Sequence, residues 1–312
     1  MSSTASGHRV LLIGNPASGG GRGRSTLRRA ATLLRELGVE VLLRESDRIG
    51  SFARHVQQHA DEVDRVIACG GDGFLSEATA SLADTDLPLA ILPGGRGNDV
   101  VRCLGVPLDL RAACRLAVTG TPRAFDLGDV NGRTFATVAT CGLDAEVSRR
   151  SRRLRLPFLG PATYFVHAIP ALLAQRPFEA RLEHDDGVFE GSLSLIAVAN
   201  TATYGGGFRI APMASTDDGL LDAIVVEARP SWQLATMAGA LRTGRHLGRP
   251  GIHHLRSRHY RLETTPAMAL EADGEPLASS PCTYRVRPEA VRVVTGEGRP
   301  LDPRHGESPG PK

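Results

Sequence analysis

The sequence predicts an α/β domain with a parallel sheet, followed by a mainly antiparallel β-sandwich domain. Short apolar runs alternate with amphipathic stretches over residues 1–124, and period-two alternation with turn residues takes over in 125–298. The first pattern is typical of a parallel sheet covered by helices on both faces, and the second of antiparallel strands. The boundary is placed near 123–126, with the last strand allowed to return to the first domain, and 299–312 is expected to be a flexible tail.

The first hundred residues contain four strands of the buried type, each followed by a loop and most by a helix. The strands are expected at 9–13, 39–43, 63–68 and 87–92, and the helices at 25–37, 51–60 and 74–83. Gly38 directly follows the first helix and is a typical carboxyl-terminal cap. Since the strands run parallel, the loops that follow them are expected to meet at the sheet edge where α/β proteins bind ligands.

The second half of the chain shows short alternating strands separated by turn residues. Strands are expected at 134–140, 178–183, 192–199 and 221–227, and helices at 161–174 and 232–241. The pair Asn131 and Gly132 is a strong hairpin signal. The sequence shows no internal repeat.

Two glycine turns that end in acid or amide side chains carry most of the functional information. Residues 70–73 read Gly-Gly-Asp-Gly, and residues 94–99 read Gly-Gly-Arg-Gly-Asn-Asp. Glycines let the backbone come close to a phosphate, and the N–H groups at a helix start attract anions. Asp72 would repel a bare phosphate, so it fits better beside Mg²⁺ or beside a hydroxyl that loses its proton. The two turns together predict nucleotide phosphate chemistry.

Simpler roles exist for each of these turns. Asp72 could cap a helix, and Asn98 and Asp99 could be the N-cap and first-turn acid of the next helix. The loop at 14–23 is neither a Walker A loop nor a dinucleotide fingerprint, and alone it could be a plain turn. Three such loops at one sheet edge favour the phosphate-binding interpretation.

Composition limits the classes of function. The chain has 312 residues, of which 41% are hydrophobic, and its formal net charge of +3 is too weak to indicate nucleic-acid binding, which is not predicted. The single lysine is Lys312, which excludes a lysine Schiff base and a Walker-type phosphate lysine. Five cysteines without metal-ligand spacing indicate free thiols in a reducing cytoplasm. Neither a signal peptide nor a membrane span is expected.

Three further segments have a functional and a structural interpretation. Residues 271–276 could be an ordinary Asp-Gly hairpin or could supply a general base, and 215–220 could hold a hard cation or simply turn the chain. Residues 149–155 carry five arginines, and apolar residues follow them. A basic segment followed by an apolar one suits an interfacial membrane contact, so 149–173 is a candidate for it, although the same apolar stretch could be core.

Taken together, these motifs resemble the diacylglycerol kinase catalytic-domain family, in its bacterial soluble lipid kinase branch related to sphingosine and ceramide kinases. The resemblance covers about 8–297, nearly the whole chain, and the order and spacing of the motifs are far more specific than any one of them. The matching segments are 15–19, 70–73 with Glu77, 95–99, 125–128, 141–145, 218–220 and 273–275. The resemblance implies an NAD kinase/diacylglycerol kinase-like α/β domain, a β-sandwich-like domain and an active site between them.

The resemblance also implies roles for matching residues. Glu275 would accept the proton of the lipid hydroxyl, Asp72 would act at the Mg-ATP site, and Asp126 would support the cleft. A structural Mg²⁺ would be held by Ser215, Asp218 and Leu220, partly through backbone oxygens. The residues expected to contact ATP are Asn15, Pro16, Ser18, Gly19, Gly70, Gly71, Asp72, Gly73, Glu77, Gly95, Arg96, Asn98 and Asp99.

Two positions depart from the family pattern, because Phe74 and Arg96 stand where the family usually has threonine close to the nucleotide. Phe74 removes a hydroxyl that would bond to phosphate or backbone. Arg96 adds a cation at the same edge, which could bind phosphate directly or fill the nucleotide pocket. Nucleotide preference is the property that these two residues would change.

The resulting prediction is an ATP- and Mg²⁺-dependent lipid kinase that transfers the γ-phosphoryl group to diacylglycerol or a similar lipid alcohol. A sphingoid-base or ceramide kinase, a kinase of a soluble substrate such as NAD, and a non-catalytic lipid- or nucleotide-binding regulator are the alternatives. The lipid substrate implies a cytoplasmic protein with peripheral contact at the inner face of the membrane. Many members of the family are dimers, so a homodimer is an alternative to a monomer.

Overall fold

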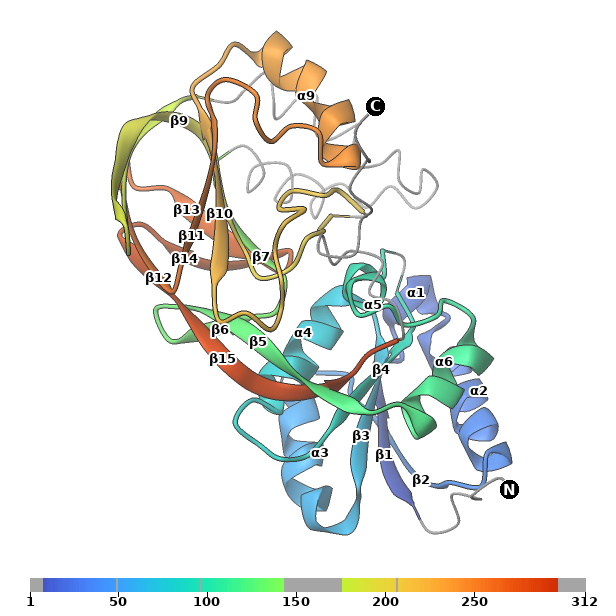
Figure 1. Ribbon diagram of the computed structural model, residues 1–312. Coiled ribbons are helices and arrows are strands. Elements are labelled where there is room, and N and C mark those ends of the chain that lie inside the picture. Colours follow the sequence, from blue (N-terminus) through green and yellow to red (C-terminus); the bar gives the residue numbers. More distant parts are fainter. Residues whose placement is uncertain (1–7, 49, 96, 143–175, 206, 297–312) are drawn as a thin grey trace, which may run out of the picture.

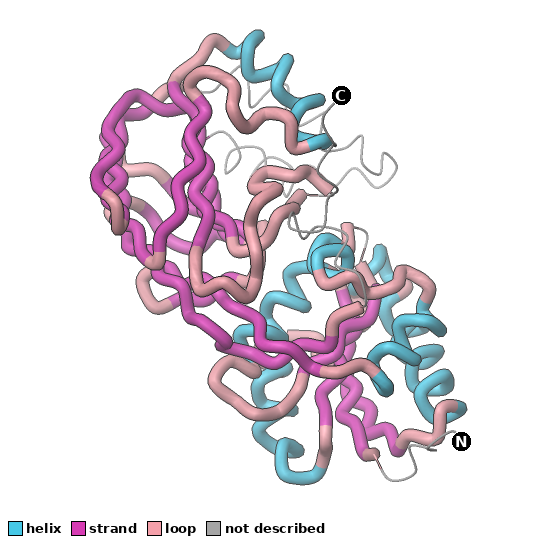
Figure 2. Tube along the Cα trace, viewed as in Figure 1, coloured by secondary structure: helices cyan, strands magenta, loops and turns pink. Residues whose placement is uncertain are grey.

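The computed structural model describes residues 8–48, 50–95, 97–142, 176–205 and 207–296. Figure 1 shows two parts, an α/β part formed by the amino-terminal residues and a β-rich part formed by most of the remainder. Figure 2 shows that helices gather around the amino-terminal strands, whereas strands dominate the second part. The predicted fold class is confirmed.

The amino-terminal strands form a parallel sheet in the order β4-β3-β1-β2. Helices α2 and α6 pack together on one face, and α3 and α4 pack together on the other (Figure 1). The strands are β1 (Arg9–Gly14), β2 (Glu40–Glu45), β3 (Arg65–Gly70) and β4 (Leu89–Pro93). The helices are α1 (Ser18–Gly21), α2 (Gly23–Glu36), α3 (Ser51–His59), η1 (Ala60–Glu62), α4 (Asp72–Ser81), α5 (Asp99–Cys103) and α6 (Leu110–Thr119).

Apolar side chains on both faces of the central strands explain why this sheet forms. Leu11, Leu12 and Ile13 of β1 are fully buried, as are Ile67 of β3 and Leu92 of β4. A strand that is buried on both faces shows a continuous apolar run in its sequence, and helices must cover both of its sides. Each expected strand and helix of this part is present, with ends that differ by a few residues.

The carboxyl-terminal part consists mainly of antiparallel strands around two clusters of buried apolar residues. Helix α9 (Ser231–Thr243) corresponds to the helix expected at 232–241. The strands are β5 (Pro122–Val130), β6 (Arg133–Phe135), β7 (Val138–Gly142), β8 (Phe178–His184), β9 (Gly187–Ala199), β10 (Leu221–Glu227), β11 (Ile252–Ser257), β12 (His259–Thr265), β13 (Ala269–Ala272), β14 (Glu275–Ser279) and β15 (Cys282–Val294).

Strand β15 belongs to both parts of the molecule. It pairs antiparallel with β12 and with β5, and near its end Val293 pairs in parallel with Leu89 of β4. Between Arg287 and Val291 its register against β5 shifts, and Glu289 has a left-handed φ of 52° there. The sheet is therefore continuous from the β-rich part into the α/β part.

The strand predicted at 134–140 is wrong in one respect, because it is broken into β6 and β7. The N–H groups of Ala136 and Thr137, at the break, donate to the carboxylate of Asp273 instead of to a neighbouring strand. The predicted hairpin turn at Asn131 and Gly132 is confirmed, with φ values of 51° and 83°.

Several other expectations can be compared with the structure. The five cysteines are free thiols, as expected. None of the described helices is long and apolar enough to cross a bilayer. The helix expected at 161–174 and the arginine run at 149–155 lie outside the described residues.

Candidate active site

The two glycine turns meet backbone to backbone at the end of the parallel sheet, as their positions after β3 and β4 predict. The N–H of Gly94 donates to the carbonyl of Gly70 over 3.0 Å. A Cβ atom added to Gly94 would lie 2.9 Å from the backbone nitrogen of Gly70, and one added to Gly95 would lie 2.6 Å from the Cα of Gly71. Only glycine allows this approach, which leaves the backbone of both turns open at the edge.

The third loop joins the same edge. The N–H of Asn15 donates to the carbonyl of Cys69 at 3.2 Å, and a Cβ on Gly19 would lie 2.9 Å from the carbonyl oxygen of Gly94. Gly19, Gly20 and Gly21 have φ values of 61°, 76° and 92°, a left-handed run that residues with side chains rarely adopt. Successive backbone N–H groups in such conformations form anion-binding concavities, so the loop suits phosphate.

The polar side chains of this loop bond within it. The Asn15 carboxamide oxygen accepts the N–H of Ala17 at 2.8 Å, and the Ser18 hydroxyl donates to the carbonyl of Asn15 at 2.9 Å. The carbonyl of Pro16 accepts the N–H of Arg24. These bonds fix the shape of the loop.

Asp72 begins α4 and reaches across to the start of α5. Its Oδ1 accepts the N–H of Val100 at 3.1 Å, and the backbone N–H groups of Asn98 and Asp99 also contribute to its environment. Burial raises the pKa of this carboxyl above its ordinary value, and these N–H groups offset part of the rise. A half-buried acid beside two glycine turns has the chemistry to orient a divalent cation.

Asn98 and Asp99 occupy the N-cap and first-turn positions of α5, as the simpler interpretation proposed. Asn98 has a left-handed φ of 54° and makes no side-chain cap. Its amide oxygen instead accepts the N–H of Gly95 at 3.0 Å, which closes the second glycine turn. The N–H of Val100 in the first turn of α5 is bonded by the carboxylate of Asp72. The amide therefore shapes the turn while the aspartate links the two helices.

Two further residues expected at the nucleotide have different surroundings. Glu77 of α4 accepts the N–H of Gly50 at 2.8 Å and so fixes the entry into α3. Arg96 lies outside the described residues.

Phe74 packs into the core beneath the first glycine turn. Its ring meets that of Phe52 on α3 edge to face, with ring centroids 5.5 Å apart, and the side chain is buried. It also lies against Gly70, where a Cβ would collide with the ring. The aromatic ring thus joins α3, α4 and the turn in place of a hydroxyl near the nucleotide.

We expect Phe74→Ala to lower the free energy of unfolding by about 3–5 kcal/mol, because it removes a buried ring that touches two helices and a turn. Phe74→Leu keeps most of the volume and should cost less than about 1.5 kcal/mol. Urea denaturation followed by circular dichroism measures both values. Equal losses for the two variants would show that the ring does not carry this packing.

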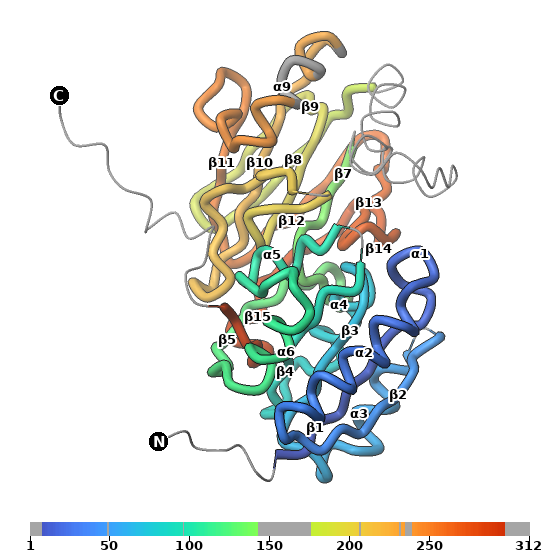
Figure 3. Tube along the Cα trace, turned by 90° about the vertical axis from the view of Figure 1, so that its right-hand side faces the viewer, coloured from blue at the N-terminus to red at the C-terminus, as the bar shows by residue number. Residues whose placement is uncertain are grey.

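Glu275 is the first residue of β14 and is exposed. The turn before it, Asp273 and Gly274, has φ values of 53° and 81°, which fits a two-residue hairpin. Both views place the β13–β14 hairpin on the side of the β-rich part that faces α4 (Figure 1, Figure 3). Within the described residues, no hydrogen bond or ion pair joins Glu275 to the glycine turns.

Asp126 is almost completely buried and ties three segments together. Its Oδ1 accepts the N–H of Glu289 on β15 and its Oδ2 accepts that of Gly219, both at 2.8 Å, while its own N–H donates to the carbonyl of Thr216. Burial raises the pKa of this carboxyl. Asp126 therefore holds β5, β15 and the 216–219 turn together where the two parts of the molecule meet.

The turn expected to hold a structural Mg²⁺ does not fit that ion as folded. Asp218 accepts the N–H of Leu220 through Oδ1 at 3.1 Å, and its Oδ2 forms an ion pair with Arg256. The Ser215 hydroxyl donates to Asp217. Mg²⁺ demands near-octahedral oxygen ligands, whereas the one carboxylate of the expected set already has a cation partner.

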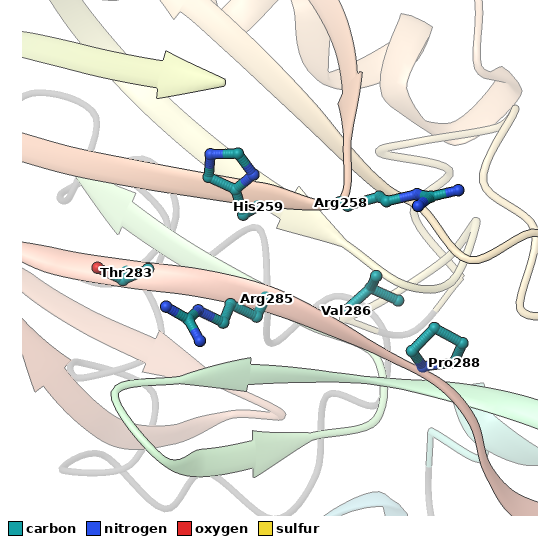
Figure 4. A pocket seen from close by; sticks show the side chains of 6 residues that line it. All are labelled: Arg258, His259, Thr283, Arg285, Val286 and Pro288. Carbon is teal, nitrogen blue, oxygen red and sulfur yellow. The ribbon is translucent and has the colours of Figure 1, made fainter. Parts of the chain in front are cut away.

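A cavity of about 440 Å³ on the β-rich part shares no residue with the glycine turns or the 273–275 hairpin. In Figure 4 the side chains of Arg258 and Arg285 point in different directions instead of converging on one point. Its lining residues are Arg258, His259, Thr283, Arg285, Val286 and Pro288. We therefore do not assign it to the phosphate site.

Sequence patterns missed two polar residues that join the site to its surroundings. Asn200, at the end of β9, is fully buried and donates through Nδ2 to the carbonyls of Asp126 and Ala136. Thr203 contacts Cys103 of α5 through its hydroxyl at 2.9 Å, which links α5 to the β-rich part. A single asparagine or threonine after a strand does not by itself indicate that its side chain will bond to residues far away in the sequence.

Comparison with known proteins identifies the family to which the chain belongs. Residues 9–130 match the family model of the diacylglycerol kinase catalytic domain, and residues 137–295 match that of the YegS C-terminal NAD kinase β-sandwich-like domain. The chain is 33% identical to the diacylglycerol kinase of Mycobacterium tuberculosis (strain ATCC 25618 / H37Rv), with 96% of each chain covered. It is also 33% identical to a Pseudomonas aeruginosa protein named as a YegS-like lipid kinase, with 94% of this chain and 96% of that one covered.

A solved structure has the same overall fold. The crystal structure of a candidate diacylglycerol kinase from Bacillus anthracis str. Sterne superposes with a TM-score of 0.76 at 25% identity, covering 93% of this chain and 98% of that one. Fold and site thus define a phosphotransferase with an α/β phosphate-binding part and a β-sandwich part. The chain belongs to the diacylglycerol kinase catalytic-domain family and is a lipid kinase.

Proposed function

We propose that this protein transfers the γ-phosphoryl group of ATP to the hydroxyl of a lipid alcohol, with diacylglycerol as the principal acceptor. The observation that carries the proposal is the meeting of three glycine loops at one edge of the sheet, beside the half-buried carboxylate of Asp72. The names of the relatives with which the chain aligns over nearly its whole length support the choice of acceptor.

Phosphoryl transfer requires positioning and charge stabilisation more than covalent chemistry. The backbone N–H groups of the three loops would bind the ATP phosphates, and the carboxylate of Asp72 would hold the accompanying cation. A bound Mg²⁺ would supply positive charge that offsets the negative charge developing on the transferred phosphoryl group. Glu275 would accept the proton of the lipid hydroxyl as that oxygen attacks the γ-phosphorus and the β–γ bond to ADP breaks.

A lipid acceptor places the reaction at a membrane surface. The protein would then be a cytoplasmic enzyme in peripheral contact with the inner face of the membrane, and 149–173 stays the predicted contact segment. A homodimer also stays a prediction.

The test is transfer of labelled phosphate from ATP with Mg²⁺ to lipids in mixed micelles. The panel holds diacylglycerol, monoacylglycerol, ceramide, sphingosine and undecaprenol, with NAD as a soluble acceptor. Labelled phosphatidic acid is the expected product. If only ceramide or sphingosine is labelled, that lipid and not diacylglycerol is the acceptor. If only NAD is labelled, the protein is a kinase of a soluble substrate. The match of the second domain to an NAD kinase β-sandwich-like domain is the observation that supports this alternative.

Transfer to no acceptor would overturn the kinase proposal if the protein also fails to bind the nucleotide. Binding is measured as a thermal shift with Mg-ATP, since a ligand that binds only the folded state stabilises it. Absence of both transfer and stabilisation would favour a non-catalytic regulator.

A further inference from the structure

One carboxylate, that of Asp273, fixes the hairpin that carries Glu275. Its Oδ2 accepts the N–H of Ala136 and its Oδ1 accepts the N–H of Thr137, both at 2.8 Å. The hydroxyl of Thr137 also donates to Oδ1, and the N–H of Asp273 donates to the carbonyl of Val138. The β13–β14 turn is therefore tied to the break between β6 and β7.

The segment that receives the hairpin is itself anchored. Asn200 donates through its side chain to the carbonyl of Ala136 at 2.9 Å and through its backbone N–H to the carbonyl of Thr137 at 2.8 Å. The same side chain donates to the carbonyl of Asp126 at 2.8 Å. A continuous set of hydrogen bonds thus runs from Asp126, between the two parts of the molecule, to the turn that precedes Glu275.

The turn alone does not explain why residue 273 is an aspartate. Asparagine is equally favoured before glycine in a two-residue hairpin, because both residues tolerate a left-handed φ. An ionised carboxylate offers acceptors on both oxygens, whereas an asparagine would direct its NH₂ group at one of the two N–H donors. The choice of aspartate at 273 is therefore explained by the donors at 136 and 137.

We propose that Asp273 is a positioning residue for phosphoryl transfer, which holds the β13–β14 hairpin so that Glu275 meets the acceptor hydroxyl. The proposal rests on the proposed function. Glu275 is exposed and makes no hydrogen bond or ion pair with the glycine turns among the described residues, so its position depends on the hairpin. A displacement of about 1 Å at a reacting group can cost on the order of 10²-fold in rate.

The test compares Asp273→Asn with Asp186→Asn, a matched change in the turn between β8 and β9 whose side chain is exposed. Asp273→Asn should lower kcat about 10- to 100-fold. The KM for ATP should stay unchanged, because the glycine loops lie on other segments. Asp186→Asn should change neither value. Thermal unfolding of both variants checks that they are folded.

A double-mutant cycle with Glu275→Gln separates positioning from a general structural effect. If Asp273 acts through Glu275, Asp273→Asn should cost little further kcat once Glu275 is glutamine. An equal loss in both backgrounds, or an unchanged kcat for Asp273→Asn in an active enzyme, would overturn the inference alone. A wild-type protein that phosphorylates no acceptor would overturn the proposed function, and the positioning role with it.

Discussion

Asp72→Asn is expected to lower kcat on the order of 10³-fold, because it removes the negative charge of the carboxylate. Among the described residues, this carboxylate joins the first glycine turn to the start of α5. Asparagine has nearly the same shape, and its amide oxygen can still accept the N–H of Val100. The fold should therefore persist, whereas Asp72→Ala would leave that donor without a partner. Initial rates at saturating ATP and lipid measure the loss.

The control for this variant is Asp86→Asn, because Asp86 lies exposed in the loop before β4. That variant should keep wild-type activity. If Asp72→Asn keeps more than about a tenth of the activity, the role given to its charge is wrong.

Burial of Asp72 also predicts the direction of a pH effect. Its folded-state pKa lies above the ordinary value of 3.8, so the ionised form is lost at a higher pH than for an exposed aspartate. Activity should therefore fall on acidification from a pH above 3.8. The folded protein binds this proton more tightly than the unfolded chain, so this group stabilises the fold increasingly as pH falls through the folded pKa. Asp72→Asn should remove that contribution, which urea denaturation at several pH values can measure.

Glu275→Gln is expected to lower kcat by about 10²- to 10⁴-fold, the range for loss of a general base. Glu275 is exposed at the start of β14, so the substitution should change the free energy of unfolding by less than about 0.5 kcal/mol. The KM for ATP should not change, because the three glycine loops remain intact. Transfer assays and urea denaturation of one preparation give all three values.

Glu179→Gln is the matched control for this variant, since Glu179 is an exposed glutamate on β8 of the same part. Its kcat should equal that of the wild type. A Glu275→Gln enzyme as active as this control would require another proton acceptor.

The amino-terminal part of the fold is predictable because each of its elements is encoded locally. The apolar run from Val10 to Ile13 predicts a doubly buried strand, and Gly38 follows the end of the next helix. Parallel topology then brings the ends of β3 and β4 together, so the contact between Gly70 and Gly94 follows from the order of the elements.

The β-rich part is less predictable because distant partners decide its details. The break at Ala136 and Thr137 depends on Asp273, which is 136 positions from Thr137. Asn200 similarly bridges Asp126 and Ala136, which lie 74 and 64 positions away. No alternation of apolar and polar residues records such bonds, so the sequence predicts Glu275 as a site residue but does not predict the contacts that hold its hairpin.

Strand β15 has a consequence for how the chain can be divided. Because β15 pairs with β4, and β5 pairs with β15, a fragment that stops at residue 124 would lack β15 altogether and most of β5. The backbone groups of β4 that now face β15 would then form a bare sheet edge, which invites pairing with another chain. A fragment cut there is therefore expected to aggregate through this unpaired edge instead of folding as an independent domain.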